Sequence, residues 1–367
     1  MASRDHIGTR LRYARERLGL TQTQVQEQTT IGGSSLSEFE HAKREPSLSQ
    51  LTQLAKLYNR PVSFFLDDSP LPVERVRWRQ KPHNAAAIEA EFLELCQQYH
   101  NLEAWSDVGA GTGLPTAGST KRRHQAERLA SEVQKTFGLG ERPAVGLLHV
   151  LEEQVGLKVF HLPFEPSGTA ACLYHADFGQ GILLNSNNPK RRRNFDLAHE
   201  LFHLLTWRSD TESSESTWEE SDEKLADTFA ASLLMPATEV RALVDEAKQD
   251  GKLSLSSIFD LARHFDVSAE ALIWRVHVLY GGTPSNNEST KAMVERARLA
   301  AITMDERISD EPPVRPARFR MLAIRALRRG DMSLGRFAQY MGITRQKAAK
   351  YMEQELDDDE AFELPSA

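Results

Sequence analysis

Apolar residues recur at helical spacing through the first 66 residues, and this pattern predicts a compact group of short helices. The expected helices lie near 7–18, 22–29, 34–41, 48–58 and 62–66. Three of them begin with a capping-box pattern: Thr21-x-x-Gln24, Ser35-x-x-Glu38 and Ser47-x-x-Gln50. The short turn at Ile31-Gly32-Gly33 joins the second and third helices as in a helix-turn-helix. We therefore expect residues 1–68 to form an all-α, five-helix helix-turn-helix domain.

Residues 69–120 differ because prolines interrupt them at one end and glycines dominate the other. Pro70, Pro72 and Pro82 break helices and mark a connection. A helical pattern at 85–105 follows, which we expect to pack on the next domain or on another subunit. The glycine-rich stretch 109–119 lacks a preceding strand and a closing lysine, so we interpret it as a flexible connection and not as a phosphate loop. The whole region is predicted to be a linker with one helix.

The pattern of residues 121–280 combines both periodicities and predicts a domain with a small β-sheet. Helical patterns at 122–137 and 144–155 precede three strand-like runs, at 157–160, 171–174 and 181–185. An apolar helix then surrounds residues 198–205, and later helices are expected at 237–248, 255–265 and 268–280. The chain as a whole is therefore expected to be α+β and mostly helical.

A last helical region is predicted over 288–356, followed by an acidic tail at 357–367. Its helices are expected at 291–307, 318–329, 333–341 and 344–353, and the last two resemble a helix-turn-helix. Because the tail Asp357-Asp358-Asp359-Glu360 would repel phosphate, we interpret this region as an accessory or dimerisation module.

Composition narrows the class of protein. With 367 residues, 40% of them hydrophobic, the chain is long enough for two or three cores. It has neither a long apolar run nor an apolar leader, so we expect a soluble cytoplasmic protein without a membrane partner. The two cysteines, Cys96 and Cys172, fit a reducing compartment and argue against cysteine-bound zinc. The net charge of −7 argues against bulk nucleic-acid affinity, although a local basic region can be hidden in that sum.

The clearest chemical signal is His199-Glu200-Leu201-Phe202-His203. On a helix, His199 and His203 lie one turn apart on the same face and can bind one metal ion, while Glu200 can reach a water on that metal. Apolar neighbours such as Phe195 and Leu204 would keep the site dry. The pattern predicts two metal ligands and a general base.

A second acidic helix supplies the groups that such a site still needs. Hydrolytic zinc sites use three protein ligands and one open position, and Glu223 completes a His-His-Glu set. Asp227, one turn further on, is placed to accept from the free ring nitrogen of a ligating histidine. The alternative is a solvated acidic helix face, since the segment from Glu215 to Glu223 is rich in acidic residues.

Together with Ala226-Asp227-x-Phe229-Ala230-Ala231 and Leu233-Leu234-Met235-Pro236, this site resembles the ImmA/IrrE family of bacterial metallopeptidases. The resemblance implies Zn²⁺ held by His199, His203 and Glu223, with Glu200 as the base, over roughly 121–280. It also implies a protein substrate, a helix-turn-helix repressor. Two residues depart from the family pattern: Phe202, where glycine is frequent, and Asp196, where threonine is common.

The first sixty residues resemble XRE/Cro-type DNA-binding domains, through Leu18-Gly19-Leu20-Thr21-Gln22 and Leu36-x-x-Phe39-Glu40-x-x-x-Arg44-x-Pro46-Ser47. The resemblance implies a double-stranded operator as partner, and a homodimer on a palindromic site. It places base contacts at Ser34, Ser35 and Ser37, and phosphate contacts at Gln22, Lys43 and Arg44.

These observations predict a DNA-binding transcriptional regulator with zinc-dependent endopeptidase activity. Its expected substrate is a helix-turn-helix repressor or antitoxin in a stress or mobile-element response. Two alternatives stay open from the sequence. The metallopeptidase-like domain could instead sense metal or bind a partner in a non-enzymatic repressor or antitoxin. The enzyme could also cut its own linkers and release the DNA-binding domain.

Overall fold

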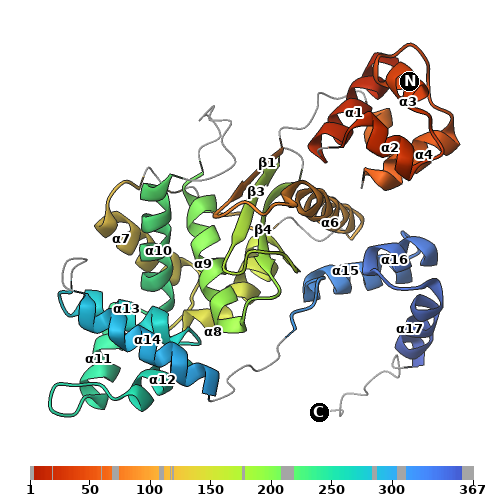
Figure 1. The fold of residues 1–367 in the computed structure, drawn as a ribbon. Coiled ribbons are helices and arrows are strands. Elements are labelled where there is room, and N and C mark those ends of the chain that lie inside the picture. Colours follow the sequence, from red (N-terminus) through yellow and green to blue (C-terminus); the bar gives the residue numbers. More distant parts are fainter. Residues whose placement is uncertain are drawn as a thin grey trace, which may run out of the picture.

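The structure is a computed structural model and consists mostly of helices around one small sheet (Figure 1). It describes these residues: 4–18, 20–58, 60–67, 74–106, 111–115, 117, 120–175, 178–207, 219–282, 287–303 and 311–357. Within these ranges, no helix is both long enough and apolar enough to cross a membrane. The acidic tail lies outside the described residues except for Asp357.

The N-terminal domain has the five predicted helices: α1 (Arg4–Arg17), α2 (Gln22–Gln28), α3 (Gly33–Glu40), α4 (Leu48–Leu57) and α5 (Val62–Leu66). Leu11, Leu36, Leu54 and Phe65 are fully buried in its core. The capping boxes that begin at Thr21 and Ser47 are both present. The box predicted at Ser35 is wrong, because α3 begins earlier and Gly32 caps it without a side chain.

The sheet contains four strands: β1 (Glu74–Trp78), β2 (Lys158–Leu162), β3 (Ala170–His175) and β4 (Gly179–Asn185). Their order is β1-β3-β4-β2. β3 is antiparallel to both neighbours, and β2 runs parallel to β4. The three strands predicted from the sequence are confirmed, whereas β1 was expected to be linker.

β1 corrects the interpretation of 69–120 as a linker with one helix. Val76 and Trp78 alternate with Arg75 and Arg77, and the strand pairs with β3 from Glu74↔His175 to Trp78↔Ala171. Val76 and Trp78 are buried on one face of the sheet. In the sequence, these residues follow a run of prolines, and every second position is charged. Both features obscured the alternation that is typical of a strand.

Helices cover both faces of the sheet. One face, with Val159, Cys172 and Ile182, packs under α9 (Lys190–Leu205), and α10 (Glu220–Leu234) lies beyond it. The other face, with Phe160 and Leu183, packs against α6 (Ala85–Trp105). The helix predicted at 85–105 therefore forms one layer of this fold (Figure 1). Of its two expected positions, it takes the one on the next domain of the same chain.

The described part of the glycine-rich stretch is held in place, which corrects its interpretation as flexible. Thr112 donates from its backbone to Gln154 O at 2.9 Å, and Gly113 donates to Val155 O at 3.2 Å. A Cβ at position 111 would stand 2.2 Å from Val155 O, so only glycine fits there. Ala117 also donates to Leu205 O, at the end of α9.

The domain around the sheet extends further along the chain than the predicted end at residue 280. The helical domain around the sheet includes α7 (Arg123–Thr136), α8 (Pro143–Val150), the π-helical turn η1 (Leu151–Val155), α11 (Ala237–Ala247), α12 (Leu255–His264) and α13 (Ala269–Leu279). Helix α14 (Glu288–Thr303) buries Val294 and Ala297 in the same core, so it belongs to this domain. In the other core, α15 (Ala317–Arg328) packs on α6, α16 (Leu334–Met341) packs on α15, and α17 (Arg345–Asp357) packs on α16.

Candidate metal centre

The predicted site residues come from two adjacent helices. His199, Glu200 and His203 lie in the last two turns of α9, where the surrounding apolar side chains anchor the helix on the sheet. Glu223 lies in the first turn of α10, which packs along α9. Both histidines and Glu200 are at most 1% exposed, so the site lies below the surface.

Three potential ligand atoms converge. Nε2 of His199 lies 3.2 Å from Nε2 of His203. One carboxylate oxygen of Glu223 lies 3.1 Å from His199 Nε2, and the other lies 3.2 Å from His203 Nε2. These three residues form the one group of potential metal ligands found among the described residues.

These distances fit a metal ion. Ligands that bind one tetrahedral ion at about 2.0–2.1 Å stand about 3.3 Å apart. The observed 3.1 to 3.2 Å is close to that value. Two imidazoles and one carboxylate also match the donor set of hydrolytic zinc sites, which keep a fourth position open.

Asp227 and Arg79 support this group from outside. Asp227 Oδ1 accepts from Nδ1 of His199 at 2.9 Å, which turns Nε2 toward Glu223. Arg79, just past the end of β1, donates to both carboxylate oxygens of Asp227 at 3.1 and 3.2 Å. Its Nε lies 3.4 Å from Glu223. Arg79 was not among the residues predicted from the sequence. The alternation of apolar and basic residues from Val76 to Arg79 was the signal that could have revealed it.

The electrostatics follow from this burial and pairing. Burial opposes a charged His199, but hydrogen bonds to Asp227 and Glu223 raise its pKa to about 9. Burial raises the pKa of Glu200 to about 7, although the charge of His199 lowers it. Within the described part of the chain, no donor of ordinary hydrogen-bond geometry reaches the carboxylate oxygens of Glu200, although the Cys172 thiol lies beside it. A buried carboxyl without such a donor is suited to exchange a proton with a reactant.

The two departures from the expected motif have defined surroundings. Asp196 accepts from Asn188 at 3.0 Å and from Arg192 at 2.9 Å, so it fixes the start of α9. Phe202 packs against Phe229 of α10, with ring centroids 5.5 Å apart. Neither side chain displaces a residue of the candidate site.

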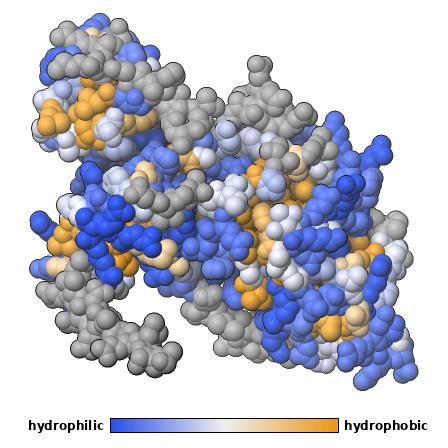
Figure 2. Space-filling model, turned by 180° about the vertical axis from the view of Figure 1, so that it is seen from behind, coloured by the Kyte–Doolittle hydropathy of each residue, from blue (hydrophilic) through white to orange (hydrophobic). Residues whose placement is uncertain are grey.

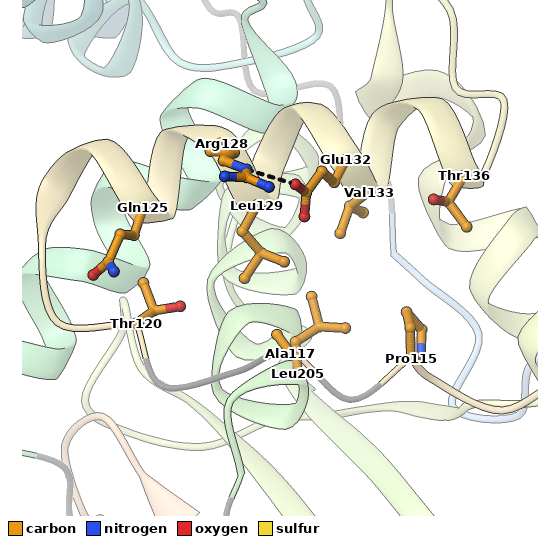
Figure 3. A pocket seen from close by; sticks show the side chains of 10 residues that line it. All are labelled: Pro115, Ala117, Thr120, Gln125, Arg128, Leu129, Glu132, Val133, Thr136 and Leu205. Carbon is orange, nitrogen blue, oxygen red and sulfur yellow. Dashed lines mark hydrogen bonds and ion pairs between the residues drawn. The ribbon is translucent and has the colours of Figure 1, made fainter.

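A pocket of about 380 Å³ lies elsewhere, between α7, the end of α9 and the residues Pro115, Ala117 and Thr120 (Figure 3). Leu129 and Leu205 point into it, and Arg128 and Glu132 pair with each other at its rim. None of the three potential ligand residues lines this pocket, so the pocket is separate from the candidate metal centre.

The residues predicted to contact DNA are all at least partly exposed. Ser34 is exposed in the first turn of α3, and Ser35 and Ser37 are partly exposed. Lys43 and Arg44 are exposed just after α3. Gln22 is tied inward, because its amide donates to Glu40 at 2.9 Å.

Family models match both parts of the chain. A helix-turn-helix model matches residues 11–65, and the model of the IrrE N-terminal-like domain matches residues 152–277. The second match contains α9 and α10 but excludes β1 and α6.

Similar proteins fall into the same two groups. The regulator ImmR of Bacillus subtilis is 37% identical over 60 residues, which cover 16% of this chain and 47% of that protein. The radiation response metalloprotease IrrE of Deinococcus deserti is 30% identical over 167 residues, covering 44% of this chain and 54% of that protein. This chain therefore spans about half the length of the curated relatives it matches. A structure of ComR from Streptococcus suis aligns over 98% of this chain and 92% of that one, with 11% identity and a TM-score of 0.18.

Proposed function

Since the chain combines a helix-turn-helix domain of the XRE type with a metallopeptidase domain of the ImmA/IrrE type, we propose that it is a DNA-binding regulator with zinc-dependent endopeptidase activity. The convergence of His199, His203 and Glu223 around one point, with Glu200 next to it, carries this proposal. The IrrE relative, a metalloprotease by name, supports it.

The proposed roles follow from the contacts. His199, His203 and Glu223 hold the ion, and Asp227 fixes the ring of His199. When bound, Zn²⁺ supplies Lewis acidity, which activates water and polarises a peptide carbonyl. Glu200 takes a proton from the attacking water and delivers it to the leaving amine. The burial that raises its pKa to about 7 suits both directions of this transfer.

The sheet offers a place for an extended substrate. β1 is an edge strand of the sheet. Arg79, which directly follows β1, contacts Asp227 at the candidate metal centre. An extended peptide can add to such an edge through main-chain hydrogen bonds. We propose that a segment of a helix-turn-helix repressor or antitoxin binds there, and that the N-terminal domain brings the peptidase to the operator of that regulator.

A Glu200→Gln variant tests the peptidase. The zinc-loaded full chain is incubated with purified helix-turn-helix repressors, and products are identified by intact-mass spectrometry, which also reveals self-cleavage. We expect the variant to retain zinc and to lose at least about 100-fold in cleavage rate, as for removal of a general base. Glu220→Gln, an exposed position on α10, is the matched control. Unchanged cleavage by the Glu200 variant contradicts the mechanism, and an inactive zinc-loaded wild type favours the non-enzymatic role.

The DNA-binding role has its own test. A double variant, Lys43→Ala with Arg44→Ala, removes the two exposed cations that follow α3. We expect the slope of log affinity for duplex DNA against log salt to fall by about 2. Equal slopes for variant and wild type would remove these residues from the interface.

A further inference from the structure

The three C-terminal helices form a second helix-turn-helix. Gly342, Ile343 and Thr344 join α16 to α17, and Gly342 adopts the left-handed conformation, with φ 65° and ψ 32°. The nearest neighbour of a Cβ there would be the flexible Arg315 guanidinium, at 2.8 Å, so it is the positive φ that favours glycine in this turn. Thr344 caps α17 by accepting from the backbone of Lys347 at 3.2 Å.

The two faces of α17 differ. Ala348 is fully buried, and the ring of Tyr351 lies 6.2 Å from that of Phe337 on α16. The first turns expose Arg345, Gln346, Lys347 and Lys350. A helix that follows the turn and presents basic and amide groups from its N-terminal end has the layout of a recognition helix.

Charge sets this unit apart from the rest of the chain. Residues 311–357, which include all three helices, contain ten Lys and Arg and five Asp and Glu, while the whole chain carries a net charge of −7. The ten basic residues lie between 315 and 350, whereas three of the acidic ones, Glu353, Glu355 and Asp357, follow them at the C-terminal end of α17. Eight of these ten basic side chains are exposed: Arg320, Arg325, Arg328, Arg329, Arg336, Arg345, Lys347 and Lys350. Strongly hydrophilic side chains gather over this unit at the left of Figure 2, below the N-terminal domain. Of the acidic tail on which the expectation of an accessory module depended, Asp358, Asp359 and Glu360 lie outside the described residues.

The unit is fixed to the same helix that contacts the N-terminal domain. Tyr340 of α16 stacks on Trp105 at the end of α6, with ring centroids 6.0 Å apart. Near the other end of α6, Glu89 pairs with Arg17 of α1 at 3.4 Å. Helix α6 therefore lies between the two helix-turn-helix units (Figure 1).

We propose that α15–α17 form a second binding surface for double-stranded DNA, in which α17 enters the major groove and the exposed arginines of α15 and α16 contact phosphates. Duplex DNA fits because the surface combines a helix able to enter a groove with a dense positive charge. The surface acts independently of the peptidase and of the N-terminal contacts.

The test uses the full chain and a fluorescein-labelled mixed-sequence duplex, with anisotropy measured over a range of salt concentrations. A triple variant, Arg345→Ala, Lys347→Ala and Lys350→Ala, should lower the slope of log affinity against log salt by about 2 to 3. The matched control replaces three exposed lysines of the other domain and changes the net charge equally: Lys121→Ala, Lys135→Ala and Lys252→Ala. It should leave the slope unchanged.

Combining the triple variant with the Lys43/Arg44 variant separates this surface from the N-terminal one, since independent contacts should give additive losses of slope. Equal slopes for the triple variant and wild type overturn the proposal, as does an equal loss in the lysine control. A loss confined to a single-stranded RNA probe overturns it in favour of RNA. A second measurement needs no variant: the duplex should protect Lys347 and Lys350, but not Lys121, from reductive methylation in the wild-type protein.

Discussion

The bond between Asp227 and His199 gives the sharpest quantitative prediction. Asp227 accepts from Nδ1 of His199 at 2.9 Å and holds the ring with Nε2 toward His203 and Glu223. Burial raises the pKa of Asp227, yet the hydrogen bond and charge of His199 and the charge of Arg79 lower it overall. The group is therefore a carboxylate at neutral pH, and the bond is charge-assisted.

Such a bond contributes about 1.5–3 kcal/mol, which corresponds to roughly 10–100-fold in affinity. Loss of an outer partner of a ligating histidine has an effect of the same size. We therefore expect Asp227→Ala to weaken zinc binding by about 10–100-fold, and Asp227→Asn to weaken it less because its amide oxygen can still accept.

The assay is competition for zinc against a chromophoric chelator, with Glu220→Gln as the control on the same helix. Arg79 adds a second criterion, because it touches Asp227 and lies further from Glu223. If Arg79 acts through Asp227, Arg79→Met should weaken zinc binding in the wild type but add little to Asp227→Ala. A change of less than threefold for Asp227→Ala, with the fold intact, would refute the reasoning.

Two further predictions concern stability. Burial, with the neighbouring charge of Glu153, raises the pKa of Glu152 to about 8, from 4.5. The folded state thus holds a proton that the unfolded state releases, so stability should fall as pH rises from about 4.5 to 8, by roughly 3–5 kcal/mol at most. Urea unfolding across that range should show this slope, and Glu152→Gln should flatten it; an equal slope in both proteins contradicts the assignment. Gly111→Ala should lower the midpoint of thermal unfolding, because its Cβ would strike Val155 O, and we expect a cost of about 1–3 kcal/mol. Gly146→Ala, in open space within α8, should instead stabilise by about 0.5–1 kcal/mol, and equal effects at both sites would contradict the contact.

The sequence predicted those parts of the molecule whose pattern is local. Helical periodicity placed the N-terminal helices within a few residues, and the spacing of His199 and His203 placed both on one face of α9. Glu223 could be predicted to lie near them because it begins the next helix along the chain, which packs on α9.

What the sequence hid depends on contacts between distant segments. Arg79 and Asp227 are separated by 148 positions, and no local pattern joins them. β1 was not predicted because prolines precede it and because charged residues occupy every second position of the strand. The packing of α15 on α6 was also hidden, since an amphipathic helix shows that it has a partner but not which one.

The path of β1 through the sheet bears on how such a chain can be divided. Family models match two separate segments, 11–65 and 152–277, which suggests two independent domains. The segment 152–277 on its own would lack Arg79. It would also expose Phe160, Leu173 and Leu183, which are buried in the core that α6 and β1 help to form. We therefore expect a fragment limited to 152–277 to aggregate, and recombination between such proteins to preserve everything from β1 onward as one inherited block.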